Sequence, residues 1–231
     1  MTAKRPLIVA IDGPAGAGKS SVSKILARRL DFSLVDTGAI YRCVALAADE
    51  QQIAFADDEG LATLLGTLAI SFKVEGESNH VFLGTRDVSE AIRTPEISLA
   101  ASQVSSRPVV RAGLLELQRR LALAANAGAI LEGRDIGTVV FPDADLKFFL
   151  HADPAIRARR RFEELFQRGN EKSLDQVAKE QKQRDREDTE REAAPLKAAD
   201  DAVQLDSTSM PLSEVVQQLE DTVRVALAKR A

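Results

Sequence analysis

The sequence has a single cysteine, Cys43, and no long apolar run. One cysteine excludes an intrachain disulfide and favours a reducing compartment. The N-terminal apolar run stops at Asp12, too early for a signal peptide, and no run approaches the ~18 residues that a membrane span needs. The formal net charge of −4 argues against a protein that coats nucleic acid. We therefore expect a soluble cytoplasmic protein without nucleic-acid or membrane partners.

Histidines are also scarce, with only His80 and His151 in 231 residues. Neither has a sequence context that indicates a catalytic dyad, so we expect both to be structural. With 45% hydrophobic residues, the chain is long enough for one sizeable core and one or two small inserts.

The most informative motif in the sequence lies between Leu7 and Ser21. An apolar run at 7–11 predicts a strand buried on both faces, and Gly13 to Ser20 fits the pattern G-x-x-x-x-G-K-[ST]. An apolar face at helical spacing follows at about 19–30. Strand, glycine loop and helix together predict a P-loop, whose backbone N–H groups cradle phosphates while Lys19 reaches the outer ones. The pattern indicates a site for a nucleoside triphosphate.

Short apolar runs alternate with helical patterns along most of the chain. We expect further strands at 33–35, 129–131, 146–150 and 203–206, and helices at about 39–49, after Pro95 and Pro108, after Pro154, and at 211–229. Gly128 is expected to end the helix that follows Pro108. This alternation predicts an α/β protein with a parallel, three-layer αβα core.

Two segments depart from that rhythm. Between about 68 and 88, apolar and polar residues alternate with period two around a turn at 75–79, which predicts a small antiparallel β insert spanning about 58–97. Residues 157–192 hold 11 Lys/Arg and 10 Asp/Glu, too many for a buried element. We expect two helices there, with Ser173 and Gln176 as a capping box.

The charge-dense helices carry arginines on shared faces. Most of these charges are explained by a solvated helical hairpin with i,i+4 pairs. However, Arg157, Arg160 and Arg161 share one face, and Arg184, Asp188 and Arg191 share another. Clustered arginines repel one another unless an anion lies among them. A bound polyphosphate would supply that anion.

Five blocks in register resemble bacterial cytidylate kinase. They are GPAGAGKSS, DTGAIYR, AASQVSSRPVVR, EGRDIGTVVFPDA, and the Arg184/Asp188/Arg191 face followed by APL. The resemblance runs from residue 7 to about 210. It implies transfer of the γ-phosphoryl group of ATP to CMP or dCMP with Mg²⁺, in pyrimidine nucleotide metabolism. It also implies a P-loop core with five parallel strands in the order 2-3-1-4-5 and a helical lid. We expect the protein to be a monomer.

The resemblance further implies a division of the chain and a set of roles. The kinase core would comprise residues 1–57, 98–150 and 195–231. Residues 58–97 would form the insert that binds the nucleoside monophosphate (NMP), and residues 151–194 would form the lid. The ATP phosphates would contact Gly13, Pro14, Ala15, Gly16, Ala17, Gly18, Lys19, Ser20 and Ser21. Catalytic charge would come from Lys19, Arg134, Arg191, Arg157 and Arg161, with Arg160 also in the lid.

The acceptor nucleotide is assigned its own residues by the same resemblance. Arg42, Arg134 and Arg191 would contact the CMP phosphate, with Thr37 nearby. Ser102, Arg111 and Asp135 would read cytosine, and Arg184 with Asp188 would reach the sugar. From the residues alone, Arg42 is equally compatible with a solvent-exposed arginine.

Metal ligands are harder to choose. The general motif favours Ser20 for Mg²⁺, although Ser21 also offers a hydroxyl. Asp36 and Glu132, at strand ends, could hold metal-bound waters or could equally serve as helix caps or loop bridges.

Two other functions stay open. One is a kinase for UMP or a shikimate-like metabolite on the same core. The other is a slow nucleotide-hydrolysing switch, which should lack the second set of arginines away from the P-loop.

Overall fold

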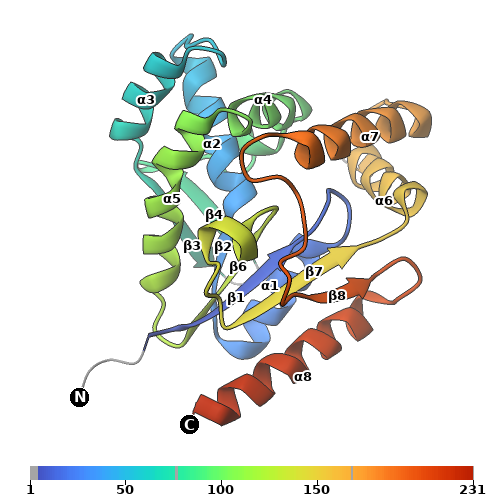
Figure 1. The fold of residues 1–231 in the computed structure, drawn as a ribbon. Coiled ribbons are helices and arrows are strands. Elements are labelled where there is room, and N and C mark those ends of the chain that lie inside the picture. The colour runs from blue at the N-terminus through green and yellow to red at the C-terminus, as the bar shows by residue number, and fades with distance from the viewer. Residues whose placement is uncertain (1–4, 76–77, 168, 231) are drawn as a thin grey trace. The chain divides into compact units, whose positions relative to one another are not determined.

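A computed structural model describes residues 5–75, 78–167 and 169–230 of the chain (Figure 1). Contacts divide the chain into two compact units. We call Met1–Ser33 with Ala125–Ala231 the P-loop unit, and Leu34–Ala124 the central unit. Among the described residues, no helix is both long and apolar enough to cross a membrane.

A five-stranded parallel sheet forms the core. Its order is β2(Ser33–Asp36), β6(Gly128–Gly133), β1(Leu7–Asp12), β7(Leu146–His151) and β8(Val203–Asp206). Counted among these five strands alone, the order is 2-3-1-4-5, so the expected sheet is confirmed. Every residue of β1 is buried, as its unbroken apolar run predicted.

The register of this sheet positions the site. Asp12, the last residue of β1, lies opposite Gly133 of β6 and Phe149 of β7. The carboxyl ends of three parallel strands therefore meet at one edge, where open α/β sheets bind their ligands.

The remaining helices of the P-loop unit form two pairs. α1(Lys19–Leu30) packs against α8(Leu212–Arg230), and α6(Pro154–Gln167) runs beside α7(Leu174–Glu190) (Figure 1). The predicted capping box at the start of α7 is confirmed, because Ser173 accepts a hydrogen bond from Gln176 N and the Gln176 side chain accepts one from Ser173 N.

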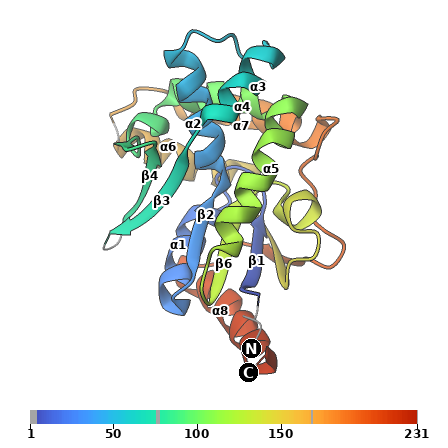
Figure 2. The same cartoon turned by 90° about the vertical axis from the view of Figure 1, so that its left-hand side faces the viewer.

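The central unit combines helices with a small sheet. Its helices are α2(Thr37–Glu50), α3(Asp58–Thr67), α4(Pro95–Ser105) and α5(Pro108–Leu123), with a short 3-10 turn, η1(Ala91–Arg93). The strands β3(Ile70–Glu75), β4(Ser78–Leu83) and β5(Arg86–Asp87) pair antiparallel, and Figure 2 shows β3 and β4 as a twisted ribbon. The predicted antiparallel strands are confirmed, while part of the predicted turn, residues 76–77, lies outside the described residues.

Several element boundaries differ from those expected. α2 begins at Thr37 rather than Ala39, because the Asp36 side chain accepts a hydrogen bond from Ala39 N and caps the helix. Residues 58–67 are helical, whereas only a β pattern was expected in that segment. α5 ends at Leu123, and Gly128 instead begins β6, where a side chain would collide with the Phe32 ring.

One element had no counterpart in the sequence pattern. After β6, the chain forms a single π-helical turn, η2(Ile136–Val140). Such turns are rare, and they occur often at functional sites.

Candidate functional site

The P-loop follows β1 directly and ends in α1. Gly13 has φ 146°, and a side chain there would collide with the carbonyl oxygen of Leu150. Gly18, with φ 93°, is the N-cap residue of α1. Both positions require glycine, because L side chains rarely adopt such backbone angles. The loop therefore has the geometry that the motif predicted, with backbone N–H groups at a helix N-terminus.

Lys19 lies within this loop with its ammonium group almost fully buried. Nζ donates hydrogen bonds to the carbonyl oxygens of Gly13 (2.7 Å) and Pro14 (2.8 Å). Burial, reinforced by the charge of Arg134, lowers the pKa of Lys19 to about 7, while Glu132 and Asp12 act in the opposite direction. The lysine is held in place by its own loop and lies in a site of low dielectric, where charge acts strongly.

Hard oxygen donors lie beside the loop. The Ser20 hydroxyl donates a hydrogen bond to Glu132 Oε2 (2.7 Å), which joins α1 to the end of β6. Asp36, by contrast, caps α2 and forms an ion pair with Arg42 (3.0 Å). The described residues contain no group of three or more His, Cys, Asp or Glu able to hold a metal ion. Ser20 and Glu132 fit a Mg²⁺ ion that keeps most of its waters.

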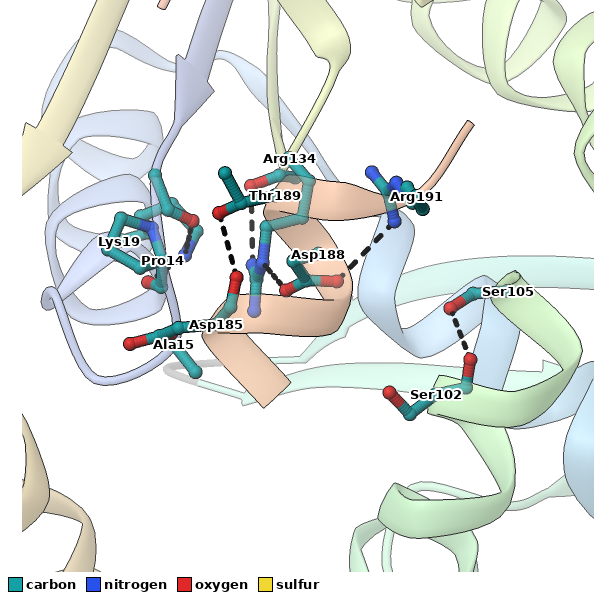
Figure 3. A network of polar contacts seen from close by, with 12 residues as sticks. Pro14, Ala15, Lys19, Ser102, Ser105, Arg134, Asp185, Asp188, Thr189 and Arg191 are labelled. Atoms are coloured by element: carbon teal, nitrogen blue, oxygen red, sulfur yellow. Dashed lines mark hydrogen bonds and ion pairs between the residues drawn. The ribbon is translucent and has the colours of Figure 1, made fainter. Parts of the chain in front are cut away.

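A cluster of arginines surrounds one buried carboxylate at the end of α7. Asp188 accepts hydrogen bonds from Arg134 Nε (2.8 Å) and Arg191 Nη1 (3.4 Å), as Figure 3 shows. Burial alone would raise the pKa of Asp188, but the charges of Arg134, Arg184 and Arg191 outweigh it and hold the pKa below its usual range. Asp188 therefore orients the arginines, a role that the sequence analysis did not assign to it.

The three predicted lid arginines of α6 differ in their surroundings. Arg157 is buried, forms a bidentate pair with Asp185 (3.1 and 2.7 Å), and donates to the carbonyl oxygen of Ala15 (3.0 Å). Arg160 donates to the Ser207 carbonyl (2.6 Å), and Arg161 pairs with Glu164 on the surface (2.8 Å).

Within this charge-dense segment, some polar side chains are nevertheless buried, which its composition did not predict. Arg157, Gln181 and Asp188 are all buried. Arg157 and Asp188 are paired with opposite charges, and Gln181 is hydrogen-bonded through Nε2, which offsets part of the cost of leaving water. Gln181 Nε2 also donates to the Ala15 carbonyl (2.8 Å), so α6 and α7 both hold the P-loop backbone.

The central unit brings together its own predicted residues. Arg42 pairs with Asp36, and Thr37 is buried at the start of α2. Arg111 donates to the Ser105 carbonyl (3.0 Å) and lies over the Tyr41 ring at 5.5 Å. The Ser105 hydroxyl donates to the Ser102 carbonyl (3.0 Å), which fixes the end of α4 (Figure 3).

Sequence reasoning missed one residue of this region. Asp12 was treated only as the end of an apolar run, but its buried carboxylate accepts hydrogen bonds from Ile136 N (2.8 Å) and Gly137 N (2.7 Å). A signal was present: an acidic residue at the end of a fully apolar strand is buried by its neighbours and needs partners. The identity of those partners was not visible in the sequence.

Comparisons with known proteins agree with this geometry. The family model for cytidylate kinase matches residues 9–225. A cytidylate kinase of Geobacter sp. (strain M21) is 53% identical over 223 residues, covering 96% of this chain and 95% of the relative.

More distant relatives match over the same extent. Cytidylate kinases of Geobacter sulfurreducens (52% identical; 96% of this chain, 94% of the relative) and Bacillus cereus (43% identical; 96% and 97%) also align along nearly the whole sequence. With its P-loop, its buried lysine and a match of this length, the chain belongs to the cytidylate kinase family.

Proposed function

We infer that this protein transfers the γ-phosphoryl group of ATP to CMP or dCMP, giving CDP or dCDP and ADP, in pyrimidine nucleotide metabolism. The observation that carries this function is the pairing, within one compact unit, of a P-loop lysine with a separate arginine cluster around Asp188. A kinase needs both, since donor and acceptor each bring phosphate charge. A nucleotide switch would need only the first.

The chemistry needs alignment and positive charge more than it needs a strong base. Phosphoryl transfer passes through a transition state whose negative charge is spread over the equatorial oxygens. We assign the P-loop, residues 13–21, to the ATP phosphates and Lys19 to the transferring group. Arg134 and Arg191, oriented by Asp188, would bind the acceptor phosphate and keep it in line.

The lid arginines would add charge from the other direction. We assign Arg157 and Arg161 to the phosphates during transfer, with Arg160 as part of the same helix. Arg157 already lies against the P-loop carbonyl of Ala15. Its guanidinium therefore already lies beside the loop to which we assign the ATP phosphates.

A magnesium ion would complete the donor side. When bound, it neutralises part of the phosphate charge. Ser20 would contribute its hydroxyl, and Glu132 or Asp36 would hold metal-bound waters. Ser20 and Glu132 already lie within hydrogen-bonding distance, whereas Asp36 is engaged by α2 and Arg42, which favours Glu132.

Acceptor recognition is assigned residue by residue. In the P-loop unit, Asp135 would read the cytosine amino group, and Arg184 with Asp188 would contact the sugar. In the central unit, Ser102 and Arg111 would read the base, and Thr37 and Arg42 would contact the acceptor phosphate side. The contacts of Arg111 with the Tyr41 ring and the Ser105 carbonyl support its role, because they hold this side chain in place before a ligand arrives.

We also propose the functional division of the chain into a core, an NMP-binding insert at 58–97 and a lid at 151–194. Within that division the enzyme would act as a cytoplasmic monomer. Sedimentation at micromolar concentration, with and without nucleotides, measures the oligomeric state directly.

A single assay tests the proposed function. ADP formation from ATP and Mg²⁺ is coupled to NADH oxidation, with CMP, dCMP, UMP or AMP as acceptor. We expect kcat/KM for CMP and dCMP to exceed that for UMP and AMP. Preferential use of UMP would indicate a different monophosphate kinase. ATP turnover that no acceptor alters would indicate the nucleotide switch.

A further inference from the structure

Asp12 lies between the P-loop and the segment that carries Arg134 and Asp135. It is the last residue of β1, it immediately precedes Gly13, and its side chain is buried with a residue exposure of 4%. The carbonyl oxygen of Gly13 in turn accepts a hydrogen bond from Lys19 Nζ. Asp12 therefore lies directly before the loop that holds the lysine.

The carboxylate of Asp12 binds two consecutive backbone amides. Oδ1 accepts from Ile136 N at 2.8 Å, and Oδ2 accepts from Gly137 N at 2.7 Å. These are the first two residues of η2, whose N–H groups have no partner inside the turn itself. The N-cap residue, Asp135, makes no side-chain cap hydrogen bond, so the cap comes from a residue more than a hundred positions away.

The far side of η2 is supported as well. A side chain at Gly137 would lie 3.1 Å from Lys147 Cδ and 3.4 Å from Asp12 Oδ2. Lys147 is itself fixed, because Nζ donates to the Pro142 carbonyl (2.6 Å) and pairs with Asp201 (2.8 Å). Gly137 thus lies between the Lys147 side chain and the Asp12 carboxylate, both held by hydrogen bonds. The start of η2 therefore has little room to move.

This arrangement costs stability. Burial raises the pKa of Asp12 to about 6, the two amides and Lys19 oppose that shift, and Asp135 adds to it. A well-packed apolar side chain would avoid the cost of burying a carboxylate. A buried charge that breaks a packing rule in this way is typical of a functional site.

We propose that Asp12 is a positioning residue for the acceptor nucleotide. By holding Ile136 and Gly137, its carboxylate fixes the segment that carries Arg134 and Asp135 with respect to the P-loop. This inference rests on the proposed function, because Arg134 and Asp135 are the residues assigned to CMP. Asp12 touches neither substrate and acts through the backbone.

The test compares two aspartates that hold the same sheet. Asp12→Asn keeps the size of the side chain but turns an NH₂ group toward one of the two amides, so one hydrogen bond is lost and one buried donor is left unpaired. Asp145→Asn is the matched control, because the Asp145 carboxylate also accepts a backbone hydrogen bond from β1, from Ile8 N at 2.7 Å, near the opposite end of that strand.

We expect the substitution to impair the use of CMP much more than the binding of ATP. For Asp12→Asn, we expect kcat/KM for CMP to fall ~10–100-fold, the loss of a hydrogen bond to a charged group. The KM for ATP should change by less than about threefold, since the P-loop lysine and glycines are intact. Asp145→Asn should change neither kcat/KM for CMP nor the KM for ATP. Equal losses for ATP and CMP, or an unchanged CMP value, would overturn the assignment.

Two further measurements keep the inference testable if Asp12→Asn fails to fold. Gly137→Ala presses on the same contact without altering a charge, and it should weaken CMP use in preference to ATP. In the unaltered protein, the Ile136 and Gly137 amides should exchange slowly with solvent before any nucleotide is added. Rapid exchange of these amides would contradict the proposal that Asp12 holds them in place. A wild-type protein that does not phosphorylate CMP would instead refute the proposed function.

Discussion

At the scale of single residues, the proposed catalytic role of Lys19 rests on its surroundings. Its ammonium group is buried between two P-loop carbonyls and lies near charges of both signs. Positive charge in such a site acts on a phosphate more strongly than it would in water, and it needs no reorganisation at the moment of transfer.

Lys19→Met should therefore reduce kcat by ~10²–10³, because such a contact contributes about 3–4 kcal/mol to transition-state stabilisation. The coupled ADP assay measures the rate, and circular dichroism checks that the fold is intact. Lys24→Met, on the exposed side of the same helix, is the control and should keep wild-type turnover. A Lys19 variant within tenfold of wild type would remove this lysine from the mechanism.

Asp135 is the residue on which base selectivity is predicted to depend. Cytosine presents an amino donor at C4, whereas uracil presents an acceptor there. With UMP bound, the Asp135 carboxylate would face that acceptor without a proton between them. An unpaired buried polar group costs about 1–3 kcal/mol, and Asp135 is buried.

Asp135→Asn offers a donor as well as an acceptor, so it should weaken CMP use and narrow the CMP/UMP ratio of kcat/KM. A narrowing of ~10-fold corresponds to the cost of one mismatched polar contact. Asp200→Asn, an exposed carboxylate, serves as the control. If the ratio stays at its wild-type value in the Asp135 variant, Asp135 does not read the base.

At the scale of elements, the α6–α7 pair has an unusual balance of forces. The buried positions of α7 are Val177, Gln181 and Asp188, so it has little apolar surface to bury. The α6–α7 pair contacts the P-loop through polar groups, with Arg157 of α6 and Gln181 of α7 both donating to the Ala15 carbonyl. Segments held in this way belong to the low-stability end of a structure.

Amide exchange across α6 and α7 should consequently be fast in the free protein and slow markedly when CMP and a non-hydrolysable ATP analogue are both bound. The measurement is hydrogen exchange read by mass spectrometry, with α8 as an internal reference that should not change. Exchange in α6 and α7 that nucleotides do not alter would indicate a solvated hairpin without a lid function.

For the whole molecule, the buried charge of Asp12 links stability to pH. Its folded-state pKa of about 6 lies above its ordinary value near 4, so the folded state binds the proton more tightly. Stability therefore falls as pH rises from about 4 to 6, by roughly 3 kcal/mol at most. Asp188 has a lowered pKa and acts with the opposite sign, losing stability as pH falls.

The contribution of Asp12 to the pH dependence can be separated from that of Asp188 by comparing wild type with Asp12→Asn. We expect the free energy of unfolding of wild type, minus that of Asp12→Asn, to decrease between pH 4 and pH 6 and to level off above pH 7. Urea titrations at several pH values measure this difference. A difference that does not vary with pH would mean that Asp12 titrates normally in the folded state.

The sequence by itself determined the features that are encoded locally. The P-loop, the five strands of the parallel sheet, the Ser173 capping box and the antiparallel pattern of the insert all follow from motifs or periodicities within a few residues. Their physical basis is short-range: backbone angles open to glycine, side chains that cap a helix, and faces that must be buried.

Only the tertiary structure decided which distant groups meet. Asp12 and Ile136, Ser20 and Glu132, and Arg134 and Asp188 are far apart along the chain. They meet because the parallel register of β1 with β6 and the return of α7 bring strand ends and a helix end to one edge. The same contacts explain the misjudged elements. Asp12 accepts hydrogen bonds from the first two amides of η2, and charged residues of α6 and α7 are buried where partners from other elements neutralise them.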